Sequence, residues 1–287
     1  MPRSQALRKA GSWLGLGPFL CFAIAFMILP ALSILAGSFM NKSGAFTFAN
    51  FAHLARQNIV ASYRVTIELS AVTAAIGTVL GALVSYAVVA GGLPKGLRSF
   101  TITFSGVASN FAGVPLAFAF IATLGRVGLV TALAKSLFGI DLYGSGFNLY
   151  SFWGLSLTYV YFQMPLMILT IEPAIVGLRR EWREASESLG ASSWTYWLRV
   201  GLPILTPSLL AAFILLFGNA FGAYATAYAL TGGMLNLVPI LIGAQIRGDV
   251  LHDPNLGYAL ALGMVVIMLA AIFLYSSLQK LASRWQR

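Results

Sequence analysis

The sequence predicts an all-α protein that crosses a membrane six times. Of its 287 residues, 59% are hydrophobic and only 9% are charged. Soluble domains carry about 25% charged residues, so a soluble protein of this composition could not cover its surface with polar groups. A bilayer core needs roughly 20 apolar residues in a helix, and six uncharged stretches of this chain reach that length.

The positions of the spans follow from these stretches and from the turn residues between them. The first lies near 15–38 and is longer than the roughly 7–15-residue core of a signal peptide, so we expect it to be retained. The other five lie near 67–90, 99–124, 148–172, 205–230 and 256–279. The segment TGGMLN at 231–236 should end the fifth span, because Gly-Gly with Asn marks a turn. The LVPILIGAQI that follows is too short to cross and predicts an interfacial or re-entrant piece.

Lys and Arg are distributed unevenly between alternate connections. With the N-terminus inside, 12 of the 18 fall on the cytoplasmic side and six on the outer side. Cytoplasmic loops of membrane proteins are enriched in these residues, so we expect both termini to be cytoplasmic, as an even number of spans also requires. No linker or low-complexity tract interrupts the chain, and residues 1–287 are predicted to form a single transmembrane domain.

The connection between the fourth and fifth spans is the most polar part of the chain. Arg183 and Glu187 have the i,i+4 spacing of a helical ion pair, and Gly190 supplies a left-handed helix stop. Ser192 or Ser193 can cap a second short helix, and one helix face combines Trp182, Ala185 and Leu189. Two interpretations remain open at this point. The loop could lie on the headgroups, anchored by tryptophans, or it could dock a cytoplasmic partner.

A resemblance favours the second interpretation. The loop resembles the signature of permease subunits of binding-protein-dependent ABC importers, which reads E-A-A, three residues, G, nine residues, I-x-L-P. Here Glu184-Ala185-Ser186 is followed by Gly190 and then by Val200-Gly201-Leu202-Pro203. Ser186 and Val200 depart from the pattern by small or isosteric changes. Three segments of the chain are similar to permeases of the spermidine/putrescine-type group, which also includes iron and phosphonate importers. They are YFQMPLMILTIEPAIVGLRREWREASESLGAS, which includes the start of the loop motif, and LPALSILAGSF and FTFANF near the N-terminus.

The resemblance implies a type I ABC importer permease fold in the bacterial inner membrane. It implies that loop 178–203 contacts a dimer of ATP-binding cassette ATPase subunits through Glu184, Ala185, Ser186, Gly190, Leu202 and Pro203. It also implies a second permease subunit, in a heterodimer as in the polyamine type, and an extracytoplasmic solute-binding protein. ATP would be bound by the partner, because this chain has no G-x-x-x-x-G-K-[ST] phosphate loop.

Other functional classes have little support in the sequence. The single cysteine, Cys21, excludes a disulfide framework, and His53 and His252 are isolated in outer loops, so no metal site, cofactor or enzyme is expected. The net charge of +10 follows membrane topology and does not indicate nucleic acid. A self-sufficient channel or secondary transporter is the alternative, but no charge lies at the centre of a span.

The solute and its pathway are the least determined features. Polar residues that could face a pathway are Asn110, Tyr159, Gln163, Asn219 and Tyr224, although helix–helix hydrogen bonds explain them equally well. Glu68 should pair with Arg64, and Glu172 should be screened by Arg179 and Arg180. The resemblance points to polyamines, whereas the outer segments carry six basic and four acidic residues. This excess opposes a polycation, so we expect a small, hydrophilic organic solute, such as a phosphonate, that is anionic or zwitterionic in preference to a polyamine.

Overall fold

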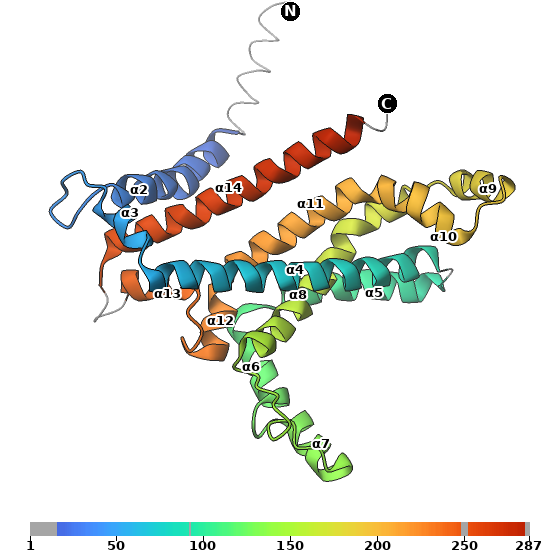
Figure 1. The fold of residues 1–287 in the computed structure, drawn as a ribbon, viewed down its shortest axis with the longest axis horizontal. Helices are drawn as coiled ribbons and strands as arrows, with labels where there is room; N and C mark the ends of the chain where they lie inside the picture. Colours follow the sequence, from blue (N-terminus) through green and yellow to red (C-terminus); the bar gives the residue numbers. More distant parts are fainter. Residues whose placement is uncertain (1–15, 92, 248–251, 285–287) are drawn as a thin grey trace, which may run out of the picture. The chain divides into compact units, whose positions relative to one another are not determined.

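The computed structural model describes residues 16–91, 93–247 and 252–284, and these residues are almost entirely helical (Figure 1). The predicted all-α class is confirmed, since the described chain has only one isolated antiparallel bridge, between Met40 and Phe46. The elements are η1 (Ile24–Ile28, a π-helical turn), α2 (Leu29–Ser38), α3 (Ala49–Leu54), α4 (Gln57–Ala90), α5 (Lys95–Asn110), α6 (Gly113–Leu124), α7 (Leu129–Phe138), α8 (Phe152–Val176), α9 (Arg180–Ser188), α10 (Ser193–Tyr196), η2 (Trp197–Gly201, also π-helical), α11 (Leu202–Phe221), α12 (Tyr224–Thr231), α13 (Val238–Arg247) and α14 (Pro254–Arg284).

Six helical stretches among the described residues are long and apolar enough to cross a membrane, as predicted. They are Leu16–Ser38, Gln57–Ala90, Gly113–Phe138, Phe152–Val176, Ser193–Phe221 and Pro254–Ser277. The third and the fifth differ most from the expected 99–124 and 205–230. The third starts at α6, because α5 is too polar to count as apolar, and the fifth starts at α10 and ends at the break after Phe221. The turn expected at 231–236 is present, with Gly232 and Gly233 at φ values of 57° and 88°. The segment after it, which is too short to cross, forms the helix α13, and its interfacial or re-entrant position stays a prediction.

Two of the predicted spans are interrupted near their middles. The stretch 99–124 breaks at Phe111–Ala112, where Gly113 adopts a left-handed φ of 73° that suits only glycine. The stretch 205–230 breaks at Gly222–Ala223. Backbone groups freed by a break need partners inside a bilayer. Here the Gly113 N–H donates to Thr226 Oγ1 at 2.8 Å, and the Tyr159 hydroxyl donates to the Ala223 carbonyl at 2.8 Å.

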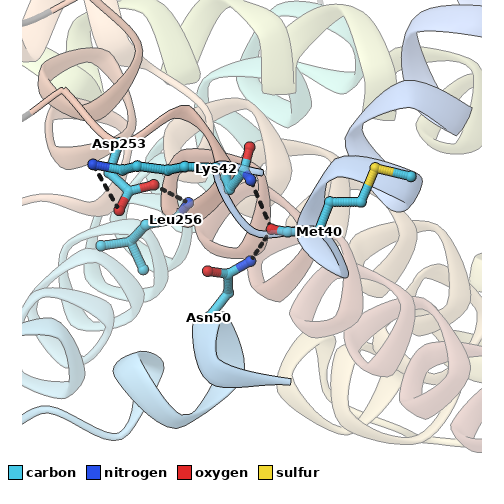
Figure 2. Close-up of polar contacts among 6 residues, drawn as sticks. Met40, Lys42, Asn50, Asp253 and Leu256 are labelled. Carbon is cyan, nitrogen blue, oxygen red and sulfur yellow. Dashed lines mark hydrogen bonds and ion pairs between the residues drawn. The ribbon is translucent and has the colours of Figure 1, made fainter. Parts of the chain in front are cut away.

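The described chain groups into two compact units, the first formed by residues up to Val60 together with Leu241–Val266. Figure 2 shows the polar contacts that hold this unit. The Met40 carbonyl accepts from Nδ2 of Asn50 at 2.8 Å and from Nδ2 of Asn255 at 2.7 Å. Lys42 Nζ lies 3.9 Å from Asp253 Oδ2. These contacts tie the loop after α2 to the start of α14. That the whole chain is one transmembrane domain stays a prediction.

The second unit comprises Ala61–Ile240 and the chain from Ile267 onward, and α8 is its central helix. α8 packs along α5 and α11 and also contacts α6 and α12. On another side α4 approaches closely, because a Cβ added at Gly81 would lie 2.5 Å from Met167 Cβ, and one at Gly77 would lie 3.0 Å from Gln163 Cβ. Small residues let membrane helices pack this tightly. The core of the unit is therefore built around the buried face of α8.

Candidate coupling loop and solute pathway

The polar segment after α8 forms the predicted short helix, α9, and the glycine turn, but the second helix, α10, is not separate: it runs on through η2 into α11 within the stretch Ser193–Phe221. In α9, Arg183 Nε donates to Glu187 Oε1 at 2.9 Å, which is the expected i,i+4 pair. A second pair, also 2.9 Å long, joins Arg180 to Glu184. The hydrogen bond that Arg183 donates to Glu187 raises the pKa of Arg183 above its usual range. The two ion pairs support α9 with local contacts only.

Gly190 ends α9 as predicted. Its φ is 76°, its N–H donates to the Glu187 carbonyl at 2.9 Å, and the N–H of Ala191 reaches back to the Ser186 carbonyl at 3.1 Å. This pair of bonds is a Schellman motif, which satisfies carbonyls that the end of the helix would leave free. Ser192 then caps α10, because its Oγ accepts from the Thr195 N–H at 3.2 Å.

The two faces of α9 differ in what they meet. The apolar face is uncovered, with Leu189 87% exposed and Trp182 36% exposed. The opposite face closes a cavity of about 560 Å³ against the ends of α4 and α8. Its lining includes the Arg–Glu pairs of α9 and an aromatic wall of Tyr86, Tyr196 and Trp197. Figure 1 shows that α9 and α10 lie at the end of the second unit where α4 ends and α5 begins. An apolar face held outward on an anchored helix suits docking of a protein partner.

The six residues expected to contact an ATPase fall into two places. Glu184 lines the cavity, Ala185 is exposed, and Ser186 is half-buried beside the Gly190 turn. Leu202 and Pro203 are exposed in the first turn of α11, outside the cavity lining. Sequence reasoning missed Tyr86 and considered Trp197 only as a headgroup anchor, yet the rings of these two residues meet edge to face with centroids 4.8 Å apart. No local pattern could have paired them, because they belong to distant parts of the chain.

The predicted pathway residues also separate. Asn110 and Asn219 line one cavity of about 750 Å³, together with Ser109, Gly218 and Tyr275 and apolar side chains of α8, α11 and α14. Both asparagines lie in the last turn of a helix that stops at a break. Each is exposed to this cavity, and within the described chain the Asn219 side chain has no hydrogen-bond partner.

The other three candidates lie in helix packing. Tyr159 is 1% exposed and holds the α11–α12 break. Gln163 is fully buried, and its Nε2 donates to Thr73 Oγ1 of α4 at 2.9 Å. Tyr224 stacks on Tyr228 with ring centroids 5.4 Å apart. For these three the structure supplies the packing role that the sequence left open, and a pathway role stays a prediction.

The acidic residues near span ends are paired. Arg64 Nε lies 2.7 Å from Glu68 Oε1, as predicted. Glu172, however, binds Arg98 of α5 at 3.2 Å in place of the expected Arg179 and Arg180. The reason is that α5 packs along α8 and brings Arg98 to the face on which Glu172 lies. Among the described residues, no group of three or more His, Cys, Asp or Glu side chains could hold a metal ion.

Comparison with known proteins assigns this arrangement to a family. Residues 77–287 match the family described as "Binding-protein-dependent transport system inner membrane component". The chain belongs to this family. It is therefore a permease subunit of an ABC importer, a multi-pass membrane protein and not an enzyme.

Relatives of this permease include proteins named for sulfate transport and for polyamine transport. The "Sulfate transport system permease protein CysT" of Escherichia coli is 26% identical over 96% of this chain and 94% of its own length. The "Probable sulfate transport system permease protein cysT" of Anthoceros angustus is 28% identical, over 58% of this chain and 55% of that protein. The "Spermidine/putrescine transport system permease protein PotB" of Haemophilus influenzae is 33% identical, but only over 44% of this chain and 43% of its own. The polyamine subgroup is thus matched over a shorter stretch than the sulfate permeases.

Solved structures confirm the fold. A bacterial ABC transporter for the acidic polysaccharide alginate matches with a TM-score of 0.75 and 15% identity over 99% of both chains. A second structure of an alginate transporter, in complex with a pentasaccharide-bound periplasmic protein, matches with a TM-score of 0.70 and 14% identity over 95% of this chain and 94% of the other. The type I importer permease fold that the loop motif implied is therefore observed.

Proposed function

We propose that this permease moves a small inorganic oxyanion of the sulfate class, with ATP hydrolysed by partner subunits that dock on α9. The observation that supports docking of the ATPase subunits most directly is the α9–Gly190–α10 loop. It presents an exposed apolar face while two ion pairs and a Schellman turn keep its shape. Such a loop can transmit movement of a partner to α8 and α11, the helices that flank it.

The proposed partners follow the family. They are a dimer of ATP-binding cassette ATPase subunits, a second permease, and an outer solute-binding protein. The solved alginate transporter described with a periplasmic protein supports the last of these. In this arrangement the chain binds no cofactor itself, and both termini lie in the cytoplasm, as the Lys and Arg bias indicates. Pairing with a different permease chain, and not with a second copy, is also part of the proposal.

Two independent features support an oxyanion. Relatives that align with most of this chain are named sulfate permeases, and the outer segments have a positive balance, with six basic and four acidic residues. The cavity between α5 and α11 offers neutral donors in the amides of Asn110 and Asn219. Neutral hydrogen-bond donors can hold an anion briefly without the tight ion pair that would trap it.

Reconstitution of the assembled transporter with its binding protein tests the solute. We expect saturable, ATP-dependent uptake of radiolabelled sulfate that unlabelled putrescine and spermidine do not reduce. Saturable polyamine uptake that sulfate fails to compete with would overturn the oxyanion assignment.

A pair of matched variants tests, in the same preparation, whether the cavity-lining face of α9 takes part in coupling. Glu184→Ala removes a side chain that lines the cavity and pairs with Arg180. Glu181→Ala removes the same charge from the first turn of α9, outside that lining. We expect Glu184→Ala to lower ATP hydrolysis stimulated by the binding protein, with membrane insertion unchanged, and Glu181→Ala to have a much smaller effect. Equal behaviour of the two variants would argue against a coupling role for the cavity-lining face of α9, which lies opposite its exposed apolar face.

A further inference from the structure

The 16-residue helix α5 carries two exposed stripes of opposite character. A polar stripe runs through Ser99, Thr103, Gly106 and Asn110, at the spacing that keeps residues on one helix face. An apolar stripe, Leu97, Phe100, Phe104 and Val107, lies about a third of a turn away and is 48–68% exposed. The remaining face, with Ser105 and Ala108, is buried. The apolar stripe suits lipid or another apolar helix, whereas the polar stripe suits neither.

The hydroxyls of this polar stripe differ from several others in the membrane helices, although the buried hydroxyls of Thr78 and Thr131 also have no partner within the described chain. Thr101 of the same helix donates to the Leu97 carbonyl at 2.9 Å, and Thr66 and Ser70 of α4 also bond back to their own helix. Ser99 and Thr103, in contrast, have no hydrogen-bond partner among the described residues. α5 packs along α8, which is itself a span, so α5 places these hydroxyls beside a membrane-spanning helix. A polar group without a partner is costly there, and water or solute would supply one.

Both ends of the polar stripe open into a cavity. At its C-terminal end Asn110 lines the 750 Å³ cavity that also contains Asn219. At its N-terminal end Ser99 and Thr103 line a second cavity, of about 280 Å³, together with Lys95 and Arg98. Between the two cavities, a Cβ added at Gly106 would meet no atom within 4 Å. The face is therefore open along its length within this chain.

The second cavity is weakly attractive to anions. Lys95 and Arg98 contribute two positive charges, and Glu172, which also lines it, pairs with Arg98 and leaves a balance of one positive charge. α5 begins at this cavity, and its N-cap residue, Pro94, makes no side-chain capping bond. The end of the helix dipole adds a partial positive charge at the same place. This end of α5 also lies next to the end of α4, which borders the cavity under α9.

We propose that the polar face of α5 is the inner half of the solute pathway. An oxyanion leaves the cavity at Asn110 and Asn219, moves past Gly106, Thr103 and Ser99, and reaches the cytoplasm beside Lys95 and Arg98. The anionic charge of the solute rests on the proposed function. The unpartnered hydroxyls of Ser99 and Thr103 and the two cavities support a water-filled face in the assembled transporter.

Accessibility of single cysteines tests the pathway directly, because Cys21 is the only native cysteine. In a Cys21→Ala background, cysteine replaces Ser99, Thr103, Gly106 or Asn110 on the polar stripe, and Phe100, Phe104 or Val107 on the neighbouring stripe as matched controls. The assembled transporter in inside-out vesicles is treated with a charged, membrane-impermeant methanethiosulfonate. Only the thiolate reacts, and each unit by which apolar surroundings raise a thiol pKa lowers the rate on the order of tenfold.

We expect the polar-stripe positions to react at least about tenfold faster than the controls, which should react only with a membrane-permeant maleimide. An anionic reagent should gain rate relative to a cationic one at positions 99 and 103, beside Lys95 and Arg98. Equal rates on the two stripes, or slow reaction along the whole polar stripe, would overturn the proposal and indicate that another helix covers this face.

A blocking variant supplies a second readout. Gly106→Leu adds a side chain where the fold has open space, so assembly should persist while transport falls at least about tenfold. Gly17→Leu, another site with nothing within 4 Å, is the matched control. Unchanged transport by Gly106→Leu would contradict the pathway. Correct accessibility with no sulfate uptake by the unmodified transporter would instead refute the oxyanion assignment and support the pathway.

Discussion

Replacement of Gly190 is the sharpest perturbation of the proposed coupling loop. A Cβ at this position would meet nothing within 4 Å, so the cost of Gly190→Ala comes from the backbone and not from a clash. Holding an L-residue at the observed φ of 76° costs about 1–2 kcal/mol. If φ relaxes instead, the bonds to Glu187 and Ser186 are lost, each worth about 0.5–1.5 kcal/mol. Either route lowers the population of the observed turn by roughly tenfold.

This energy is too small to unfold the spans but large enough to misplace α9. Gly190→Pro is more severe, because proline fixes φ near −65° and cannot form the turn at all. We expect both variants to insert in the membrane normally. We also expect both to lose binding-protein-stimulated ATP hydrolysis in proteoliposomes and to retain less ATPase subunit in a pull-down, with the proline variant lower.

Gly139→Ala is the control for strain alone. Gly139 ends α7 with φ at 66°, its N–H donates to the Lys135 carbonyl, and a Cβ there would also meet nothing within 4 Å. It has the same backbone cost in a different loop, so ATPase retention should be unchanged. If Gly190→Pro retains the ATPase and hydrolyses ATP at the normal stimulated rate, the reasoning that assigns coupling to this loop is refuted.

Three further outcomes are expected. In the Cys21→Ala background, single cysteines at positions 45 and 135 should be labelled from outside intact cells, and those at 95 and 188 only after permeabilisation; outside labelling at 188 would contradict the topology. Gly81→Leu should lower the free energy of unfolding in detergent by about 1–3 kcal/mol, since its Cβ would lie 2.5 Å from Met167 Cβ and 2.8 Å from a backbone oxygen. Gly106→Leu should leave this free energy unchanged, because a Cβ there meets no atom within 4 Å. Arg98→Ala and Glu172→Ala should be less destabilising together than the sum of the single variants, by about 0.5–3 kcal/mol in a double-mutant cycle; strict additivity would show that the 3.2 Å pair contributes nothing.

Features that depend on near neighbours in the chain could be predicted from the sequence. The class of protein and the number of spans follow from runs of apolar residues. The α9 ion pair, the Gly190 stop and the Ser192 cap follow from interactions between residues three to five positions apart. The Arg64–Glu68 pair is of the same kind. Such contacts form within one helix or turn, so they need no knowledge of what packs beside it.

Features that depend on which helix faces which required the tertiary structure. Asn110, Asn219 and Gln163 are similar polar residues within apolar stretches of sequence. The two asparagines line a cavity, whereas Gln163 is buried against Thr73 of α4. Likewise, Glu172 meets Arg98 because α5 lies along α8. The sequence around Gly113 contains a helix-breaking signal, but Thr226 and Tyr159, which satisfy the two breaks, come from distant segments. Hydropathy measures how apolar a residue's neighbours along the chain are, whereas these outcomes depend on neighbours across the helix packing.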